Sequence, residues 1–465
     1  WTSSRKFIWD GMKVIIPENN NEVMVMSLYP KEAYNLYRKF STKAVAHTIK
    51  TYSEFTIPYP YPVAQSIEAA NGMEYPMICF NYGRTEKDGT YSEGIKNGMI
   101  GVIIHEVGHN FFPMIINSDE RQWSWMDEGL NTFVEYLTEE KWDNKFPSRR
   151  GPAHTIVDYM KLPKDQLEPI MTNSENINQF GPNAYAKPAT GLNILRETIM
   201  GRELFDKAFK TYAKRWAFKH PEPADFFRTM NDASAENLDW FWRGWFYGID
   251  AVDIAIDKVT VATPNLNETP DSQELTYTVD KPLQNDFEDI SKIRNRADKN
   301  TTFYTDTDKE TQDFYWRYNR GMEKVDQNKT YTLKTENLDK VPAADKAKLQ
   351  NINAYQIDFK NIGGMVMPII LEFTFEDGTK LNDKLSAQIW RKNEQKVSRT
   401  YYFDKKLKSI QLDPMRETAD IDLSNNFWGE IAAPKTKFEV FKQKNSAAVR
   451  GEAQGKINPM QAAKK

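Results

Sequence analysis

The chain has 465 residues, of which 27% are charged and 40% hydrophobic, and its formal net charge is −3 at pH 7. This length allows two or three domains with sizeable cores, and the balanced charge provides no basic surface for nucleic acid. The sequence contains no run of eighteen apolar residues that could span a membrane. It has a single cysteine, Cys79, which excludes an internal disulfide and a cysteine zinc cluster.

The first 250 residues alternate strand-like and helical patterns. The chain starts at Trp1 with neither an initiator methionine nor a signal peptide, so we interpret it as a fragment or a processed form. Apolar runs at residues 13–16 and 23–28 are typical of β-strands. Helical patterns follow and end near Gly248, which predicts a first domain of mixed structure over residues 1–250.

An apolar run leads into His105, Glu106 and His109, which form His-Glu-x-x-His. Positions four apart on an α-helix lie within about 40° of each other, so both imidazoles point at one spot and Glu106 lies next to it. Burying these polar side chains without a partner would cost free energy, and a metal ion is their usual partner. Pro113 has no N–H, which predicts that the helix kinks or ends near residues 110–112.

Glu128 follows His109 after eighteen intervening residues. A Zn²⁺ ion held by two histidines and one carboxylate keeps a fourth position open for water, and a carboxylate that is not a ligand can take the proton of that water. We therefore predict one zinc ion per chain on His105, His109 and Glu128, with Glu106 as the general base.

A second helix is predicted from about Trp125, where Ser124 and Asp127 form a capping pair. Glu128 then falls in its first turn, and Glu135, seven residues later, shares its face. We expect Glu135 to orient a ligand histidine, with a solvated surface charge as the alternative. The apolar stripe of this helix consists of Leu130, Phe133, Val134 and Leu137.

Strand-like alternation dominates after Ala251. Asp377 and Gly378 form a hairpin signal between two apolar runs. We predict a β-sandwich-like domain over residues 251–435 and a peripheral or frayed tail at residues 436–465. The polar stretch near residues 284–350 is either an insertion or loops with short helices. The segments with period-two alternation are residues 254–261 and parts of residues 366–375, 387–390 and 408–412.

These motifs resemble those of the gluzincin aminopeptidases, the family of aminopeptidase N, and its bacterial members in particular. The resemblance starts from His105-Glu-Val-Gly-His109, the eighteen-residue spacer and Trp125-Met-Asp-Glu128-Gly129. Asn71-Gly72-Met73-Glu74-Tyr75-Pro76 is similar to the GxMEN exopeptidase motif, and Tyr185-Ala-Lys187-Pro188-Ala-Thr to the family's Tyr-x-Lys-Gly-Ala segment. The aromatic stretch from Phe226 to Tyr247 resembles the helix pair that closes the catalytic domain.

The resemblance implies roles for two further side chains. Glu74 would bind the free α-amine of the substrate, and Tyr185 would stabilise the tetrahedral oxyanion. Backbone groups at Gly72 and Met73 could hold the substrate as an added strand, since glycine lets a ligand approach the backbone closely. The motif has asparagine where this chain has Tyr75, which bears on strict exopeptidase preference.

The resemblance also implies an α+β fold. Residues 1–250 would form a thermolysin-like, two-lobed catalytic domain, mostly helical with a small sheet. Family members carry a β-rich domain ahead of the catalytic one, so an N-terminal β-domain absent from this chain is an expected partner, and export to the periplasm or beyond is the expected location. The expected substrates are peptides with a free N-terminus; a thermolysin-like endopeptidase and an inactive peptide-binding relative are the alternatives.

Overall fold

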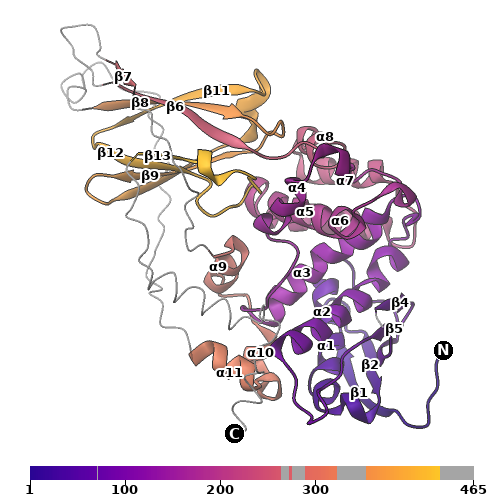
Figure 1. The fold of residues 1–465 in the computed structure, drawn as a ribbon. Helices are drawn as coiled ribbons and strands as arrows, with labels where there is room; N and C mark the ends of the chain where they lie inside the picture. The colour runs from indigo at the N-terminus through magenta and orange to yellow at the C-terminus, as the bar shows by residue number, and fades with distance from the viewer. Residues whose placement is uncertain (71, 263–271, 275–287, 322–351, 430–465) are drawn as a thin grey trace.

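The computed structural model describes residues 1–70, 72–262, 272–274, 288–321 and 352–429. Helices are concentrated in the first 250 residues, and two of the three sheets follow them in the chain, so the protein has the predicted α+β composition (Figure 1). Within the described residues, no helix is both long and apolar enough to cross a membrane. The tail predicted for residues 436–465 lies outside the described part.

The first sheet has five strands in the order β1-β2-β3-β5-β4. Strands β2, β3 and β5 run parallel, whereas β1 and β4 are antiparallel to their neighbours, and β4 forms one edge. The two predicted apolar runs lie in β1 and β2, and Cys79 of β5 is buried as expected. The bounds are β1 Ile8–Ile15, β2 Glu22–Tyr29, β3 Val63–Glu68, β4 Met73–Tyr75 and β5 Ile78–Asn81.

Two long helices pack beside this sheet and against each other, α1 (Tyr34–Phe55) and α2 (Glu93–Gly108). Most apolar residues of α2 are buried, as its sequence predicts: Met99, Ile100, Ile103, Ile104 and Val107. Six further helices complete this half of the chain: α3 Leu130–Trp142, α4 Val157–Met160, α5 Lys187–Ile194, α6 Arg202–Trp216, α7 Pro223–Ser234 and α8 Asp239–Trp245.

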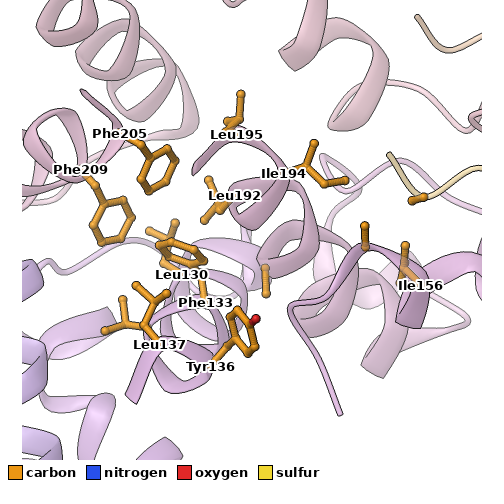
Figure 2. Close-up of a cluster of buried hydrophobic side chains, with 14 of the residues drawn as sticks. Leu130, Phe133, Tyr136, Leu137, Ile156, Leu192, Ile194, Leu195, Phe205 and Phe209 are labelled. Carbon is orange, nitrogen blue, oxygen red and sulfur yellow. The ribbon is translucent and has the colours of Figure 1, made fainter. Parts of the chain in front are cut away.

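The stripe predicted on α3 forms the centre of a buried cluster with α5 and α6 (Figure 2). The Phe133 ring lies 5.3 Å from that of Phe205 and 5.4 Å from that of Phe209, between ring centroids. Leu130 and Leu192 are fully buried in the same cluster. This packing fixes α3, and with it the residues that α3 contributes to the site below.

The chain after Ala251 forms two four-stranded sheets, with orders β10-β9-β12-β13 and β11-β8-β6-β7. Phe373 of β9 lies 4.8 Å from Tyr401 and 5.2 Å from Phe403 of β11, between ring centroids, so an aromatic core joins the two sheets. The bounds are β6 Ile254–Ala262, β7 Ser272–Glu274, β8 Asn353–Asn361, β9 Ile369–Phe375, β10 Lys380–Leu385, β11 Lys396–Phe403, β12 Leu407–Leu412 and β13 Phe427–Gly429.

One predicted strand segment is wrong, and the hairpin signal is right. Residues 387–390 lie in a 3₁₀ helix, Ala387–Arg391, in which Ala387 and Trp390, three apart, are both buried. A 3₁₀ helix has three residues per turn, so this spacing places both side chains on one face. Gly378 adopts a φ of 82° in the turn between β9 and β10, where the hairpin was predicted.

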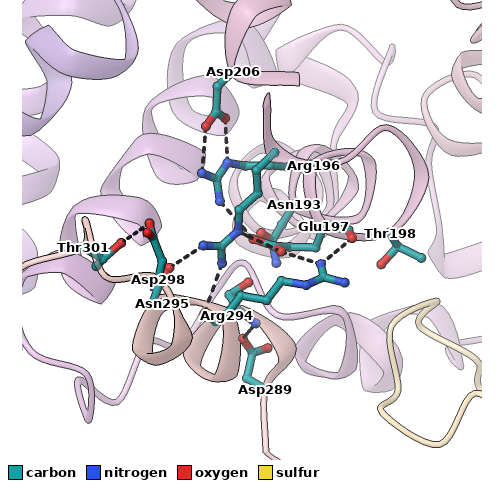
Figure 3. A network of polar contacts seen from close by, with 12 residues as sticks. Asn193, Arg196, Glu197, Thr198, Asp206, Asp289, Arg294, Asn295, Asp298 and Thr301 are labelled. Carbon is teal, nitrogen blue, oxygen red and sulfur yellow. Dashed lines mark hydrogen bonds and ion pairs between the residues drawn. The ribbon is translucent and has the colours of Figure 1, made fainter. Parts of the chain in front are cut away.

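The described part of the polar insertion forms helices that pack on the helical half of the chain (Figure 1): α9 Ile290–Ala297, α10 Tyr304–Thr307 and α11 Phe314–Gly321. Tyr304 stacks on Trp142 of α3, with ring centroids 4.8 Å apart. Arg294 of α9 donates to the buried carboxylate of Glu197, which also pairs with Arg196 (Figure 3). This segment therefore contacts the first half of the chain, although it lies between strands of the second in the sequence.

Candidate active site

Helix α2 ends at the residues that the sequence singles out. Its first turn is capped by Ser92, whose side chain accepts a hydrogen bond from the backbone N–H of Ile95 at 3.1 Å. The helix stops at Gly108, and Phe112 has a non-helical backbone (φ −129°, ψ 112°) directly before Pro113. The break falls where proline was predicted to cause it, directly after His109.

His105, His109 and Glu128 bring three ligand atoms together. His105 Nε2 lies 3.1 Å from His109 Nε2 and 3.1 Å from Glu128 Oε2, and His109 Nε2 lies 3.4 Å from the same carboxylate oxygen. Ligand atoms bonded to a tetrahedral zinc ion at about 2.0–2.2 Å are roughly 3.3 Å apart. The spacing of these three atoms therefore fits the expected ion.

The other ring nitrogen of each histidine faces an acceptor. His105 Nδ1 lies 2.8 Å from Glu135 Oε2, and His109 Nδ1 lies 2.8 Å from the Phe112 carbonyl oxygen. An ionised carboxylate and a carbonyl accept but do not donate, so each Nδ1 carries the proton. The two Nε2 lone pairs then face each other at 3.1 Å, an arrangement that a shared cation relieves.

The acidic side chains favour positive charge at this cluster. Burial alone would lower the pKa of His105, but Glu135 and Glu128 outweigh burial and raise it to about 9. Burial would likewise raise the pKa of Glu128, but the two histidines hold it well below its usual range. The site therefore stabilises an ionised carboxylate next to a cation.

Asp127 is where the sequence placed it, but it does not cap the helix. The chain enters a π-helical turn at Trp125–Gly129, close to the predicted start, yet Ser124 already has helical φ and ψ and makes no capping bond. The Ser124 hydroxyl contacts the hydroxyl of Ser174, and Asp127 Oδ1 lies 2.9 Å from His109 Nδ1. The predicted capping pair is wrong because both side chains have tertiary partners.

Glu106 lies beside the ligand cluster with one carboxylate oxygen, Oε2, buried and without a hydrogen-bond partner. Burial raises its pKa to about 7, although His105 and His109 act in the opposite direction. A carboxylate with this pKa can exchange a proton near neutral pH.

Gly72, directly before strand β4, and Glu74 of β4 lie near Glu106. A Cβ atom at Gly72 would lie 2.2 Å from Glu106 Oε1, so only glycine fits at this position without displacing the carboxylate. Ligand-capable atoms of Glu74, Glu106 and His109 lie within 4.8 Å of one another. Met73 is exposed beside them at the edge of the sheet.

Tyr185 closes the cluster on another side. Its hydroxyl donates to Glu128 Oε1 at 2.6 Å, and its ring stacks on His105 with centroids 5.7 Å apart. Burial and Glu128 raise the pKa of the Tyr185 hydroxyl above its ordinary value, so it remains a proton donor. Tyr185 lies in the π-helical turn Gly181–Ala186, directly before α5.

The proline that departs from the family motif is accommodated locally. Pro188 lies in the first turn of α5, where a missing N–H costs little. A Cβ atom at Gly129 would lie 2.5 Å from Pro188 Cγ. The glycine after Glu128 thus leaves room for the proline ring.

Sequence reasoning missed two contributors to the site. The Asn131 side chain donates to the His105 carbonyl oxygen at 2.9 Å, a bond whose only sequence signal is its position one helical turn after Asp127. The guanidinium carbon of Arg150 lies 4.5 Å from the Tyr185 ring centroid, and no pattern in the sequence marks Arg150.

Residues 40–245 match the model of the Peptidase family M1 domain. Aminopeptidase M1-A of Oryza sativa subsp. japonica is 23% identical over 235 residues, covering 47% of this chain and 26% of the relative. Probable aminopeptidase 1 of Sulfurisphaera tokodaii is 26% identical over 235 residues, covering 46% and 29%. The alanine/arginine aminopeptidase of Saccharomyces cerevisiae is 23% identical over 310 residues, covering 62% and 36%.

A solved structure, Legionella pneumophila aminopeptidase A in complex with aspartic acid, aligns with 89% of this chain and 38% of its own at a TM-score of 0.53 and 12% identity. This likeness concerns the fold alone. The chain spans about a quarter to a third of the length of the curated relatives named above. The family match includes the three clustered ligand residues, Glu106, Glu74 and Tyr185, so residues 40–245 are similar to the Peptidase family M1 domain.

Proposed function

We propose that this chain contains the catalytic centre of a zinc-dependent aminopeptidase, which hydrolyses the N-terminal residue from peptides. The observation that carries the proposal is the convergence of His105 Nε2, His109 Nε2 and Glu128 Oε2 within 3.4 Å of one another, beside the unpaired buried oxygen of Glu106. His105, His109 and Glu128 would hold one zinc ion per chain.

When bound, zinc polarises the scissile carbonyl and lowers the pKa of the attacking water toward about 7. Glu106 accepts the proton of that water on its free oxygen and delivers it to the leaving amine. Glu135 holds His105 in the tautomer that presents Nε2 to the ion, and the Phe112 carbonyl does the same for His109.

Tyr185 and Glu74 act on the substrate itself. The Tyr185 hydroxyl, which now donates to Glu128, can turn its proton to the oxyanion, a type of contact worth roughly 10²–10³ in turnover. Glu74 pairs with the substrate's ammonium group, which sets the register for removal of one residue. Met73 of edge strand β4 and Gly72 directly before it offer backbone groups to an extended substrate.

The domain organisation follows the same proposal. Residues 1–250 form the two-lobed, thermolysin-like catalytic domain, and the two packed sheets within residues 251–435 form a β-sandwich-like domain. A β-domain ahead of the catalytic one would complete the substrate pocket in the whole protein, and export to the periplasm or beyond is proposed from the family resemblance alone.

One experiment tests the proposal. The purified chain should contain about one equivalent of zinc and release p-nitroaniline from alanine p-nitroanilide, and a chelator should abolish this release until zinc is added back. Glu106→Gln should bind zinc equally and release no product, because its amide cannot accept the proton. Normal turnover by that variant, or activity that is insensitive to the chelator, would overturn the assignment.

The substrate's N-terminus distinguishes the two hydrolase alternatives. Aminopeptidase action requires that N-acetylation of a short peptide abolish its cleavage, since Glu74 would have no ammonium group to bind. Equal cleavage of acetylated and free peptides would instead identify an endopeptidase.

A further inference from the structure

Arg150 is held in place next to the site by a rigid turn. Gly151, the next residue, has a φ of 107°, and a Cβ atom there would lie 2.4 Å from the ring of Tyr136. The Gly151 carbonyl accepts a hydrogen bond from the buried side chain of Asn193 at 3.1 Å. Tyr136 directly follows Glu135 on α3, so the same helix that orients His105 also fixes the backbone next to Arg150.

Arg150 is partly buried, and its guanidinium group stacks on the Tyr185 ring, 4.5 Å from the ring centroid. Among the described residues, no carboxylate lies within ion-pair distance of it. The neighbouring Arg149 is exposed. A partly buried guanidinium retains five N–H donors, which suit a planar carboxylate that brings its own charge.

Arg150 and Glu74 contact different members of the cluster. Glu74 lies with Glu106 and His109, whereas Arg150 lies on Tyr185, which contacts Glu128 and His105. A substrate with its ammonium group at Glu74 therefore extends its other half toward Tyr185. Glu74 supplies a negative group for the substrate's amine and Arg150 a positive group beyond Tyr185, which matches the two charges of a short zwitterionic peptide.

We propose that Arg150 binds the α-carboxylate of a dipeptide or tripeptide substrate, which makes the site selective for short peptides with a free C-terminus. This inference rests on the proposed aminopeptidase function. Consecutive Cα atoms are about 3.8 Å apart, so the carboxylate of a dipeptide lies only one residue beyond the scissile bond, within the span of an arginine side chain.

The test compares Ala-Ala with its C-terminal amide, Ala-Ala-NH₂, as substrates of the whole chain. In Arg150→Ala, the ratio of kcat/KM for the free acid to kcat/KM for the amide should fall by about 10-fold or more, mainly through KM, because a charge-assisted hydrogen bond is lost. Arg150→Lys should recover part of the ratio, since lysine keeps the positive charge but not the two parallel N–H donors of the guanidinium group. Arg149→Ala, the matched control, should keep the wild-type ratio.

Binding gives a second readout that does not depend on turnover. In a Glu106→Gln background, adding Arg150→Ala should weaken the affinity for Ala-Ala by about 10-fold and weaken that for Ala-Ala-NH₂ much less. Calorimetric titration measures both.

Three outcomes would overturn the inference. Equal loss with the acid and the amide would mean that Arg150 acts through Tyr185. Loss that appears only with Ala-Asp-NH₂, which carries its carboxylate on a side chain, would refute the α-carboxylate assignment. An unchanged ratio would exclude a contact with the substrate. If the wild-type chain does not hydrolyse alanine p-nitroanilide at all, the proposed aminopeptidase function is wrong. This result is distinct from the three outcomes above, which concern only Arg150.

Discussion

At Gly72, the absence of a side chain determines where the proposed base can lie. We expect Gly72→Ala to lower kcat by about 100-fold or more, because the new methyl group would lie 2.2 Å from Glu106 Oε1 and displace the carboxylate. Zinc content and the circular dichroism spectrum should not change, since Gly72 is exposed at the edge of the sheet. Steady-state kinetics with alanine p-nitroanilide measures the effect.

Gly98 provides the control for this substitution. It lies on α2, the helix of Glu106, and a Cβ atom there would meet nothing within 4 Å. Gly98→Ala should keep full activity and slightly raise stability, because alanine favours the helix by up to about 1 kcal/mol. Activity of Gly72→Ala within twofold of wild type would contradict the close contact described above.

Single residues also show what the sequence can reveal about the site. The spacing of His105, Glu106, His109 and Glu128 predicted the cluster because helical geometry alone brings the first three together. The position of Glu135, seven residues after Glu128, pointed toward the same centre. By contrast, Asp127 was assigned to a local cap, because a local pattern contains no information on the histidine of another helix that it contacts.

At the scale of single elements, His47 of α1 provides a pH-dependent contact with α3 and α10. It is buried between Trp142 and Tyr304, and its Nε2 lies 3.0 Å from the Thr138 carbonyl oxygen. Burial lowers its pKa to about 4. Between pH 6.5 and 4, the unfolded chain therefore binds a proton that the folded chain does not, and stability falls as pH falls.

The resulting decrease in the free energy of unfolding should reach about 3 kcal/mol at pH 4 and be absent above pH 7. Urea unfolding at several pH values measures it. His47→Gln should be less sensitive to acid by that amount, whereas the exposed His220→Gln should follow wild type. If the free energy of unfolding changed with pH equally in wild type and His47→Gln, the prediction would be contradicted.

One of the buried carboxylates that hold helix α9 is Glu197. The Glu197 side chain is 1% exposed and contacts Arg196, Arg202 and Arg294 at 2.7–2.9 Å. We expect Glu197→Gln to lower the free energy of unfolding by about 3–5 kcal/mol, because it leaves three partly buried guanidinium groups without their shared partner. Denaturant unfolding and limited proteolysis near α9 measure the loss.

The exposed pair of Glu288 with Arg296, on and next to the same helix, provides the comparison. Glu288→Gln should cost less than about 1 kcal/mol, as is usual for ion pairs in water. Similar losses for the two variants would show that burial of Glu197 does not determine the effect.

The elements that the sequence predicted well are those with a local cause. Proline broke α2 before Pro113, and glycine formed the turn at Gly378, because these residues restrict or permit backbone angles by themselves. The segment Ala387–Trp390 was misassigned, since four residues contain too little periodicity to separate a strand from a 3₁₀ helix. Neighbouring strands and the burial of Trp390 decided its structure.

At the scale of the whole molecule, the bound metal should stabilise the fold. Zinc that binds the folded chain only, at 100 times its Kd, adds about 2.7 kcal/mol. We therefore expect a chelator to lower the melting temperature and added zinc to restore it, measured by differential scanning fluorimetry. Glu128→Gln should lose most of this zinc-dependent change in melting temperature. A wild-type melting temperature that is the same with and without zinc would contradict the prediction.

The placement of the polar insertion could not have been predicted from its sequence. Its composition indicated an insertion or loops with short helices, but not where these pack: Lys292 contacts the buried Glu140, and Lys96 of α2 lies 3.2 Å from Asp313. Such pairs join positions more than a hundred residues apart, so neither composition nor periodicity identifies them. The α+β composition, in contrast, follows from local periodicity.

The docking of α9, α10 and α11 on the first half of the chain has a consequence for its synthesis on the ribosome. Strand β6 emerges before these helices, and β8, which pairs with it, emerges after them. At about 5–20 residues per second, β6 is synthesised several seconds before β8, and in that interval α9, α10 and α11 become available to the helical half. Translation therefore completes the helical half of the chain before the sheet that contains β6 and β8 can form.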